Sequence, residues 1–254
     1  MVLLISIDGL RPDALGIGYT PTLDALARDG YRAENARTLM PCCTLPCHNS
    51  MLRGVPVERH GITSNVFQPL VRPVPSALDQ AARFQLRCGA FYNWGPLRDL
   101  YEPESVLAGI YLQDSHREEG DVRVADFALS HLKDDGLDFA FVYFGHVDEQ
   151  GHRTGWMSDE YLEAARNADR QVLRLREAFP EANLLVMSDH GGHDRTHGTE
   201  MEEDMRIVAL AHGPSVPRKL DSGSASIEQA AATAIGLLGI APVNEWASPF
   251  FAPV

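Results

Sequence analysis

The sequence predicts an α/β fold, a three-layer αβα sandwich with a mostly parallel central sheet. Continuous apolar runs alternate along the chain with segments of helical periodicity, which is the order of an α/β protein. The apolar runs do not alternate with polar residues, which favours strands that are covered on both faces. With 254 residues, 44% of them hydrophobic, the chain is long enough to bury one large core. We expect a single domain over 1–254.

Five buried strands are expected from the apolar runs. The first run, VLLISI, leads directly into an Asp-Gly pair, and FAFVYF and NLLVMS lead into other polar, glycine-containing segments. Glycine at such points permits the tight turns that follow strands. The five expected strands lie at 2–7, 84–92, 139–144, 183–188 and 206–211.

Helices are expected between these strands. Thr20 precedes a proline and is a candidate N-cap, while Ser158 is a candidate N-cap before acidic residues and a stripe of apolar ones. A shorter helix should start near Pro46. Segment 93–120 is the least regular part and is interpreted as a small insertion over the rim where the strands end. The other expected helices lie at 20–30, 121–136, 158–179 and 226–239.

Charge and hydropathy exclude several classes of partner. The formal net charge of −13 would repel a nucleic-acid duplex and anionic membranes. The chain contains no run of 18 apolar residues that could span a bilayer. Its first residues lack the basic region of a signal peptide, so a cytoplasmic location is expected. The sequence does not indicate an oligomeric state.

The four cysteines, Cys42, Cys43, Cys47 and Cys88, are expected to be small, buried and reduced. Their spacing lacks the paired C-x2-C modules of a structural zinc site. A cysteine nucleophile is the rival interpretation, but no neighbouring residue offers itself as the base.

Side chains of the kinds that bind metals follow three of the expected strands. Each one alone would be a helix cap, a turn residue or an exposed loop residue. Ligands of open α/β sheets bind beyond the carboxyl ends of the strands, so together these residues indicate one site. Their number exceeds what one zinc ion takes from a protein, which favours two divalent ions, zinc before manganese or iron. The residues are Asp8; Asp148 and His152; and Asp189, His190, His193 and His197.

Several motifs together resemble the alkaline phosphatase superfamily, and within it the type I phosphodiesterase/nucleotide pyrophosphatase branch. The resemblance covers the chain from end to end and implies an alkaline-phosphatase-like fold. The motifs are LISIDGLRPD (4–13), TPTLDALARDG (20–30), PCCTLPCHNSMLRGVPVERHGITSN (41–65), FVYFGHVDEQGHRTG (141–155), MSDHGGHDRTHG (187–198) and LLGI (237–240).

The resemblance also implies roles for single residues. Thr44 would be the nucleophile, and Asn65 would contact a phosphoryl oxygen through its amide. One ion would be held by Asp8, Asp189, His190 and the Thr44 oxygen, the other by Asp148, His152 and His197. His193 and Asp194 match no ligand position. His193 would either lie behind the metal ligands and support them or be exposed, and the exposed position is favoured.

The implied reaction is hydrolysis of small phosphodiesters through a covalent phospho-threonine. Two divalent ions, three aspartates and an alkoxide leave the centre near neutral, which suits a monoanionic diester. A phosphomonoesterase or phosphonate hydrolase is the alternative. A monoesterase would benefit from an arginine beside the nucleophile, and Arg53 lies about 13 Å from Thr44 along a helix. Other arginines, such as Arg98 or Arg153, could approach the site instead. A sulfatase would need the sequence motif C-x-P-x-R, which is missing. A metal-binding protein without catalytic activity would not need the threonine nucleophile.

The substrate itself is less defined by the sequence. The chain is shorter than typical members of the branch, which favours broad activity on aryl or alkyl phosphodiesters, with nucleotide pyrophosphates as the alternative. Four aromatic residues could stack on a base or aryl group but are expected mainly to pack: Phe67, Tyr92, Trp94 and Tyr101.

Overall fold

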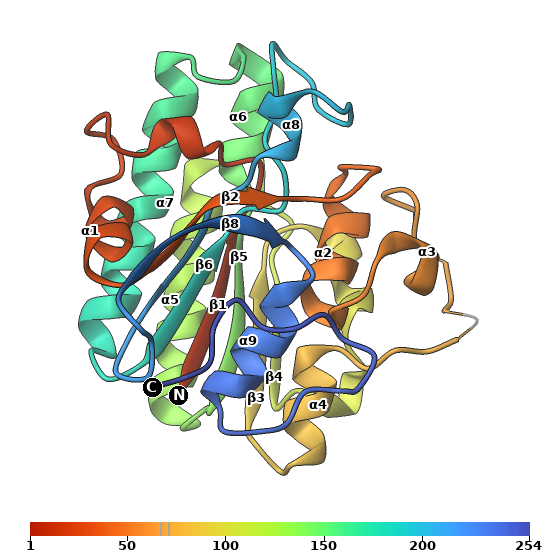
Figure 1. The fold of residues 1–254 in the computed structure, drawn as a ribbon. Coiled ribbons are helices and arrows are strands. Elements are labelled where there is room, and N and C mark those ends of the chain that lie inside the picture. Colours follow the sequence, from red (N-terminus) through yellow and green to blue (C-terminus); the bar gives the residue numbers. More distant parts are fainter. Residues whose placement is uncertain (67, 71) are drawn as a thin grey trace.

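One sheet runs through the molecule. The computed structural model describes residues 1–66, 68–70 and 72–254 (Figure 1). The strands are β1 (Val2–Ile7), β2 (Tyr31–Arg37), β3 (Cys88–Tyr92), β4 (Ala108–Tyr111), β5 (Phe139–Phe144), β6 (Asn183–Met187), β7 (Ala209–His212) and β8 (Lys219–Ser226). Their order in the sheet is β4-β3-β5-β1-β6-β7-β2-β8. Only β7 among these strands runs antiparallel to its neighbours, so the sheet is mostly parallel, as predicted.

Helices cover both faces of the sheet (Figure 1). One layer contains α1 (Pro21–Asp29), α5 (Glu118–Asp134), α6 (His146–Thr154) and α7 (Asp159–Ala178). The other contains α2 (Thr44–Arg53), α4 (Ala77–Arg83) and α9 (Gln229–Leu237). The short elements are α3 (Val57–His60), α8 (Glu202–Met205), η1 (Pro12–Ala14), η2 (Gly95–Leu100) and η3 (Pro103–Ser105). The predicted three-layer αβα sandwich is confirmed.

Strand β1 divides the core into two parts. Val2 and Leu4 point to the side of α2, α4 and α9, while Leu3 and Ile5 point to the side of α1, α5 and α7. All four side chains are fully buried. Both faces are apolar because both are covered, and this explains why the run showed no alternation.

The apolar runs located five strands but not all of their ends. β1 and β5 have the predicted limits, whereas the strand expected at 84–92 begins only at Cys88. Phe84 closes helix α4, and Gln85 takes a left-handed φ of 62°, so the chain turns before it enters the sheet. The run at 206–211 yields β7, which begins at Ala209.

Three strands and four α-helices of the described chain were not predicted, and two of these helices, α3 and α8, have only four residues each. Strand β8 is an edge strand of sequence KLDSGSAS and is largely exposed, so its residues carry no apolar signal. Strands β2 and β4 are also partly exposed. Helices α4 and α6 are only 7 and 9 residues long, too short to show a clear period.

The two proposed helix caps differ. Ser158 accepts a hydrogen bond from Tyr161 N at 3.2 Å, which confirms the cap of α7. The Thr20 hydroxyl instead donates to the carbonyl of Ala14, and no side-chain cap bond forms there. The N-terminus of α1 is capped by the Asp169 carboxylate of α7, which accepts from the amides of residues 22 and 23 at 3.1 and 2.8 Å.

Segment 93–120 is structured along much of its length. It supplies η2, η3 and the outer strand β4. None of the helices formed by the described residues is long and apolar enough to cross a membrane.

The buried carboxyl group of Asp121, in α5, holds together the residue after β3 and the residue before α6. Asp121 Oδ1 accepts hydrogen bonds from Asn93 Nδ2 at 2.8 Å and from Gly145 N at 3.1 Å. Its Oδ2 is buried with no partner among the described residues. Burial raises the pKa of Asp121 to about 7, because the charged form is poorly solvated there.

We predict that this group makes the wild type less stable as the pH rises. Between pH 4 and pH 7 the unfolded state loses the Asp121 proton while the folded state keeps it, so the free energy of unfolding falls across this window. The substitution Asp121→Asn removes the titration. Denaturation at a series of pH values should show the variant gaining up to about 4 kcal/mol on the wild type between pH 4 and pH 8. Parallel pH profiles would contradict this.

Candidate active site

The aspartates and histidines that could bind metal ions lie together at the carboxyl ends of the three central strands. Strands β5, β1 and β6 are neighbours in the sheet. Asp8 directly follows β1, Asp189 follows β6 after one serine, and α6 starts just beyond β5 with Asp148 in its first turn. A cavity of about 210 Å³ opens there. Its lining residues are Asp8, Thr44, Asn65, Trp94, Tyr143, Gly145, Asp148, Glu149, His152 and His197.

The first cluster consists of Asp8, Asp189 and His190. Nε2 of His190 lies 3.3 Å from Asp8 Oδ1 and 3.3 Å from Asp189 Oδ2. One donor atom from each residue lies within 4.8 Å of the others. All three residues are buried, so the cluster is closed to bulk water on most sides.

The second cluster lies next to the first and shares His190 with it. Its members are Asp148, His190 and His197, again with donor atoms within 4.8 Å of one another. His197 Nε2 is 3.8 Å from Asp148 Oδ1, and His152 Nε2 is 3.5 Å from Asp148 Oδ2. Asp148 and His152 are four residues apart on α6 and therefore face the same way. The structure thus brings together the six aspartates and histidines to which the resemblance gave a metal ion, whereas His193, the seventh residue singled out, lies apart from them.

The three histidines present the same nitrogen to the clusters. Each ring has Nδ1 at a backbone carbonyl oxygen, to which a protonated Nδ1 donates, and this leaves the lone pair of Nε2 free for a metal ion. The partners are Gly191 O for His190 (2.8 Å), Cys42 O for His197 (2.9 Å) and Arg195 O for His152 (3.1 Å).

Three carboxylate oxygens in the clusters have no hydrogen-bond partner within the described residues. They are buried atoms, one each from Asp8, Asp148 and Asp189. Burial, with the charges of the neighbouring carboxylates, raises the pKa of Asp8, and burial raises the pKa of Asp148 to about 6. Burial also lowers the pKa of His197 to about 3, so this ring stays neutral. Buried, unpaired acceptors beside neutral imidazoles fit divalent cations.

The other oxygens of two aspartates are fixed by the surrounding chain. Tyr143 Oη donates a short hydrogen bond to Asp8 Oδ2, and Gly9 N donates to Asp189 Oδ1 at 3.1 Å. Gly9 has a φ of 66° and lies so close to Asp148 that a Cβ atom would come within 3.0 Å of it. Tyr143 was missed from the sequence, because one tyrosine within a buried strand carries no signal of its own.

Thr44 is the first residue of α2 and points to the first cluster. Its side chain is buried, and Oγ1 lies 3.4 Å from His190 Nε2. Asn65 Oδ1 accepts a hydrogen bond from Leu45 N at 2.9 Å, and the Asn65 amino group has no hydrogen-bond partner within residues 1–66, 68–70 and 72–254. The helix N-terminus adds backbone N–H groups and a positive dipole end beside the hydroxyl.

His48 is a further residue that sequence reasoning missed. It is fully buried one turn after Thr44, with Nδ1 2.7 Å from the Thr44 carbonyl oxygen and Nε2 2.8 Å from Ser6 Oγ. Nδ1 also lies 3.5 Å from Asp189 Oδ2. His48 therefore connects α2 with β1 and with the first cluster. Its spacing of four residues from Thr44 was the only signal that could have found it.

The cysteines are free thiols. Cys42, Cys47 and Cys88 are buried, as predicted, but Cys43 is only half-buried because it lies at the N-cap of α2. Burial raises the pKa of Cys42 and of Cys88 to about 12 and also raises the pKa of Cys43. The thiols therefore stay protonated, which argues against a cysteine nucleophile.

His193 is not the exposed residue that was expected. Its side chain is 18% exposed, and Nδ1 lies 2.7 Å from Asp204 Oδ1. Asp204 also accepts from the backbone and hydroxyl of Thr199. The pair holds the loop that carries His197, whereas Asp194 is exposed.

No lysine or arginine is among the described residues that line the cavity. Arg53 is buried and donates to Asn49 Oδ1 at 3.0 Å and to backbone carbonyls, so it serves packing. Tyr92 and Tyr101 share a hydrogen bond at 3.2 Å between their hydroxyls. Four aromatic residues could have stacked on a substrate, and Phe67 lies outside the described residues. Of the three described ones, Trp94 lines the cavity, whereas Tyr92 and Tyr101 do not.

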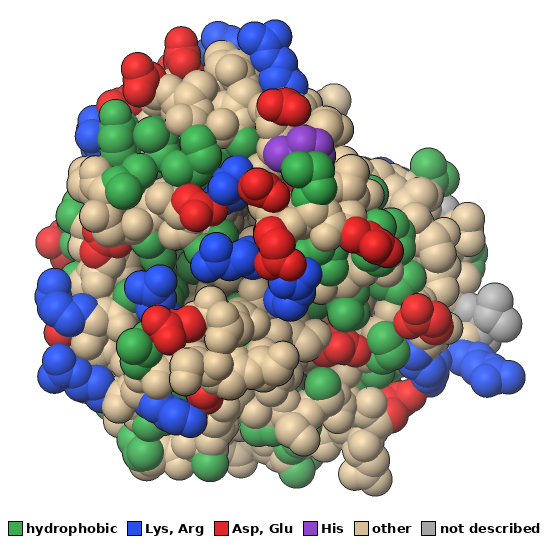
Figure 2. Space-filling model, turned by 45° about the horizontal axis from the view of Figure 1, so that its top comes forward, with side chains coloured by type: hydrophobic (Ala, Val, Ile, Leu, Met, Phe, Trp, Pro, Cys, Tyr) green, Lys and Arg blue, Asp and Glu red, His purple; other side chains and the backbone are tan. Residues whose placement is uncertain are grey.

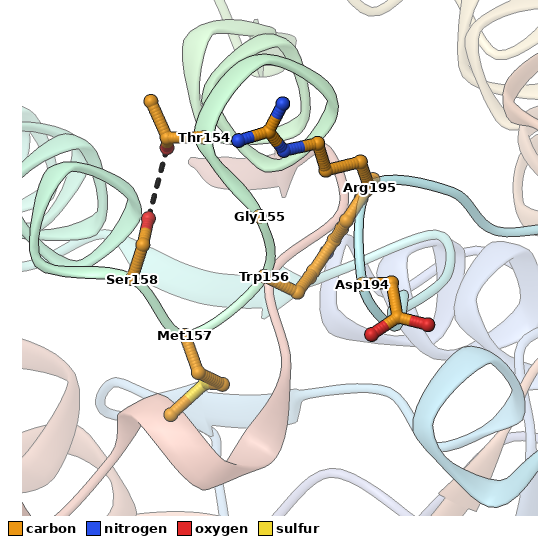
Figure 3. A pocket seen from close by; sticks show the side chains of 7 residues that line it. All are labelled: Thr154, Gly155, Trp156, Met157, Ser158, Asp194 and Arg195. Atoms are coloured by element: carbon orange, nitrogen blue, oxygen red, sulfur yellow. Dashed lines mark hydrogen bonds between the residues drawn. The ribbon is translucent and has the colours of Figure 1, made fainter.

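A larger hollow of about 640 Å³ contains no cluster residue (Figure 3). It lies where the loops after His152 and before His197 are joined, with Trp156 N donating to Asp194 O at 2.8 Å. The Trp156 indole packs edge-on against His152 and His197, with ring centroids 5.0 and 5.9 Å apart. We assign the active site to the smaller cavity, since the unpaired carboxylates lie there.

The surface above this rim carries mixed charge. Figure 2 shows acidic and basic side chains interspersed over that face instead of gathered into one field. The net charge of −13 is thus not concentrated on this face.

The sheet order, the two helical layers and the rim of aspartates and histidines define a member of the alkaline phosphatase superfamily. The family described as type I phosphodiesterase / nucleotide pyrophosphatase matches residues 2–74 and 74–212. The chain belongs to this family, and the predicted resemblance is confirmed.

Sequence relatives agree with this assignment. Human ectonucleotide pyrophosphatase/phosphodiesterase family member 7 is 30% identical over 217 residues, which cover 75% of this chain and 47% of the relative. The chain thus spans about half the length of the curated relatives it matches.

Solved structures show the same fold. Murine ectonucleotide pyrophosphatase / phosphodiesterase 5 superposes with a TM-score of 0.81 at 16% identity, covering 98% of this chain and 97% of that one. The phosphonate monoester hydrolase SpPMH from Silicibacter pomeroyi superposes with a TM-score of 0.73 at 16% identity, covering 98% of this chain and 75% of that one.

Proposed function

We propose that the protein hydrolyses phosphodiesters by means of two bound divalent ions and a covalent phospho-threonine on Thr44. One observation supports this proposal above all. Buried carboxylate oxygens without hydrogen-bond partners among the described residues, and imidazole Nε2 atoms that face the two clusters, lie beside one buried hydroxyl group. A plain structural cluster would pair these oxygens with protein donors.

The residues present fit two ions. Asp8, Asp189, His190 and the Thr44 oxygen would hold one, and Asp148, His152 and His197 the other. The mixture of nitrogen and oxygen donors favours zinc, with manganese or iron as alternatives. Ions bound there would act as Lewis acids and lower the pKa of a hydroxyl group that contacts them.

The chain's own residues then perform two displacements. Thr44 Oγ1 gives up its proton and attacks phosphorus, the bond to the leaving oxygen breaks, that oxygen takes up one proton, and the remaining phosphoryl ester is bonded to Thr44. Water then gives up a proton and attacks phosphorus, the Thr44 Oγ1–P bond breaks, and Oγ1 takes up a proton to become a hydroxyl again. Asn65 would donate a hydrogen bond from its amino group to a phosphoryl oxygen, and the α2 N-terminus favours the negative charge that develops there.

A solved structure of similar fold supports the choice of a threonine as the nucleophile. An inactive threonine-to-alanine variant of murine ectonucleotide pyrophosphatase / phosphodiesterase 5 is described in complex with AMP. Thr44 is the threonine that lines the cavity here. The phosphonate monoester hydrolase of similar fold keeps phosphonate esters as a second candidate substrate class.

The substrate class can be tested with p-nitrophenyl esters. With zinc-loaded protein, we expect kcat/KM for methyl p-nitrophenyl phosphate to exceed that for p-nitrophenyl phosphate, because the cavity offers no arginine or lysine for a second negative charge. Methyl p-nitrophenyl phosphonate tests the second candidate. A clear preference for the monoester would contradict the proposed function.

Asn65 offers a further test. Asn65→Ala should lower kcat by about 100-fold through loss of one donor to the phosphoryl group. Asn65→Asp keeps an acceptor for Leu45 N, loses the donor and adds a negative charge beside the phosphoryl group, so its kcat should fall at least as far as that of Asn65→Ala. If Asn65→Asp retains wild-type kcat, the amide does not act on the substrate.

A further inference from the structure

Trp156 lies against two histidines of the second metal site, and no step of the proposed reaction uses it. It belongs to the short connection from α6 to α7 (Figure 3) and is only 7% exposed. Its ring centroid lies 5.0 Å from that of His152 and 5.9 Å from that of His197, at interplanar angles of 85° and 69°. Because protein interiors are close-packed, an indole in this position restricts the rotation of both imidazoles.

The same indole contacts all three chain segments that follow the central strands. Its Nε1 donates to the carbonyl oxygen of Gly9, after β1, at 2.9 Å. A Cβ atom on Gly151 of α6, which follows β5, would lie 2.6 Å from the ring, and one on Gly192, after β6, would lie 2.2 Å from it. Only glycine lets the backbone approach a ring so closely. Trp156 therefore joins the segments after β1, β5 and β6.

His152 depends on this contact more than any other residue of the two clusters. Its side chain is 42% exposed, and apart from the indole its ring is held by the hydrogen bond between Nδ1 and the carbonyl oxygen of Arg195. His197 has a further support, since its ring stacks on that of His190 with centroids 3.9 Å apart. Without the indole, the His152 ring could turn its Nε2 atom away from an ion at the second site.

The first cluster has supports that do not include the indole. Its three side chains are at most 3% exposed and are enclosed on most sides. The carbonyl oxygen of Gly9, next to Asp8, also accepts a hydrogen bond from Tyr161 Oη at 2.9 Å, so it keeps a donor when the indole is absent. Within the described part of the chain, the ring contacts of Trp156 do not include His190. Loss of the indole should therefore affect the two metal sites unequally.

We propose that Trp156 is a positioning residue for the second metal site. By holding the rings of His152 and His197, it keeps their Nε2 atoms directed at one ion and so raises the affinity of that site, while the first site is nearly independent of it. This inference rests on the proposed function, which supplies the two ions. Removal of a group that only orients metal ligands typically lowers metal affinity by roughly 10- to 100-fold.

The test withdraws zinc from zinc-loaded protein with increasing concentrations of a chromophoric chelator, which gives one dissociation constant for each ion. In Trp156→Leu one of the two constants should rise by about tenfold or more, while the other stays at its wild-type value. The substitution Asp148→Asn, which should remove the second ion, shows which constant this is. Adding Trp156→Leu to Asp148→Asn should leave the remaining constant unchanged.

Three further variants separate positioning from general stability. Trp156→Phe keeps an aromatic ring against the imidazoles and loses only the Nε1 donor, so it should restore most of the affinity that Trp156→Leu loses. Gly151→Ala keeps the indole but displaces it, and it should weaken the same ion even if Trp156→Leu does not fold. Trp246→Leu removes an indole of similar burial that packs on Gly54 at the other end of α2, so it should lower Tm and leave both constants unchanged.

The possible failures of the inference and of the proposed function can be told apart. Equal increases of both constants in Trp156→Leu would show that the indole only stabilises the fold. Two unchanged constants would show that it does not position the histidines. Either result overturns the inference and leaves the proposed function intact. Wild-type protein that binds fewer than two zinc ions would contradict the proposed function, and this inference would fail with it.

Discussion

Replacing Thr44 by alanine should abolish turnover of phosphodiesters while both metal ions remain bound. The hydroxyl is the only group of the protein that we propose to attack phosphorus, so kcat should fall by about 1,000-fold or more. The imidazole and carboxylate donors of both clusters stay in place. Steady-state kinetics together with metal analysis of the purified variant measure the two quantities.

Two neighbouring substitutions control this experiment. Thr44→Ser keeps a hydroxyl and should retain part of the activity. Cys43→Ser changes the half-buried residue next to it and should leave kcat within a few-fold of the wild type, because burial keeps that thiol protonated. A Thr44→Ala protein with unchanged kcat would remove the nucleophile from the proposed mechanism.

Replacing Asp148 by asparagine should remove one of the two ions and also abolish turnover. Asp148 is the only carboxylate of the second cluster, and its Oδ1 is one of the buried oxygens without a partner. An amide is a much poorer metal ligand than a carboxylate, so bound zinc should fall from about two to about one ion per chain. We expect kcat to fall by about 1,000-fold.

A nearby histidine provides the matched control. His193 lies in the same loop as His197 but pairs with Asp204 and not with the clusters. His193→Gln can still donate to Asp204, so the protein should keep both ions and most of its activity. Asp148→Asn protein that still carries two zinc ions would show that the second cluster has been assigned wrongly.

The fold class and the metal-type residues could be predicted from the sequence because both depend on local patterns. Buried strands appear as apolar runs, and the residues directly after them, such as Asp8 and Asp189, must lie at one rim of a parallel sheet. Edge strand β8 could not be predicted in the same way, since its side chains face water and need not be apolar.

The parts of the site that were missed are defined by tertiary contacts. His48, Tyr143 and Trp156 become functional candidates only because strand pairing and helix packing bring them to the clusters. The sharing of His190 between two clusters also depends on side-chain geometry. By contrast, Asn65 was found through a motif and not through spacing or periodicity.

The three central strands have a consequence for how the protein matures. Strand β1 pairs with β5 and β6, so the site joins segments about 140 and 180 residues apart in the chain. Such distant pairings form late and slowly, after the cost of closing long loops has been met. During synthesis, the proposed metal ions could find a complete binding site only after residue 197 has emerged, so metal uptake and acquisition of the native state should occur together.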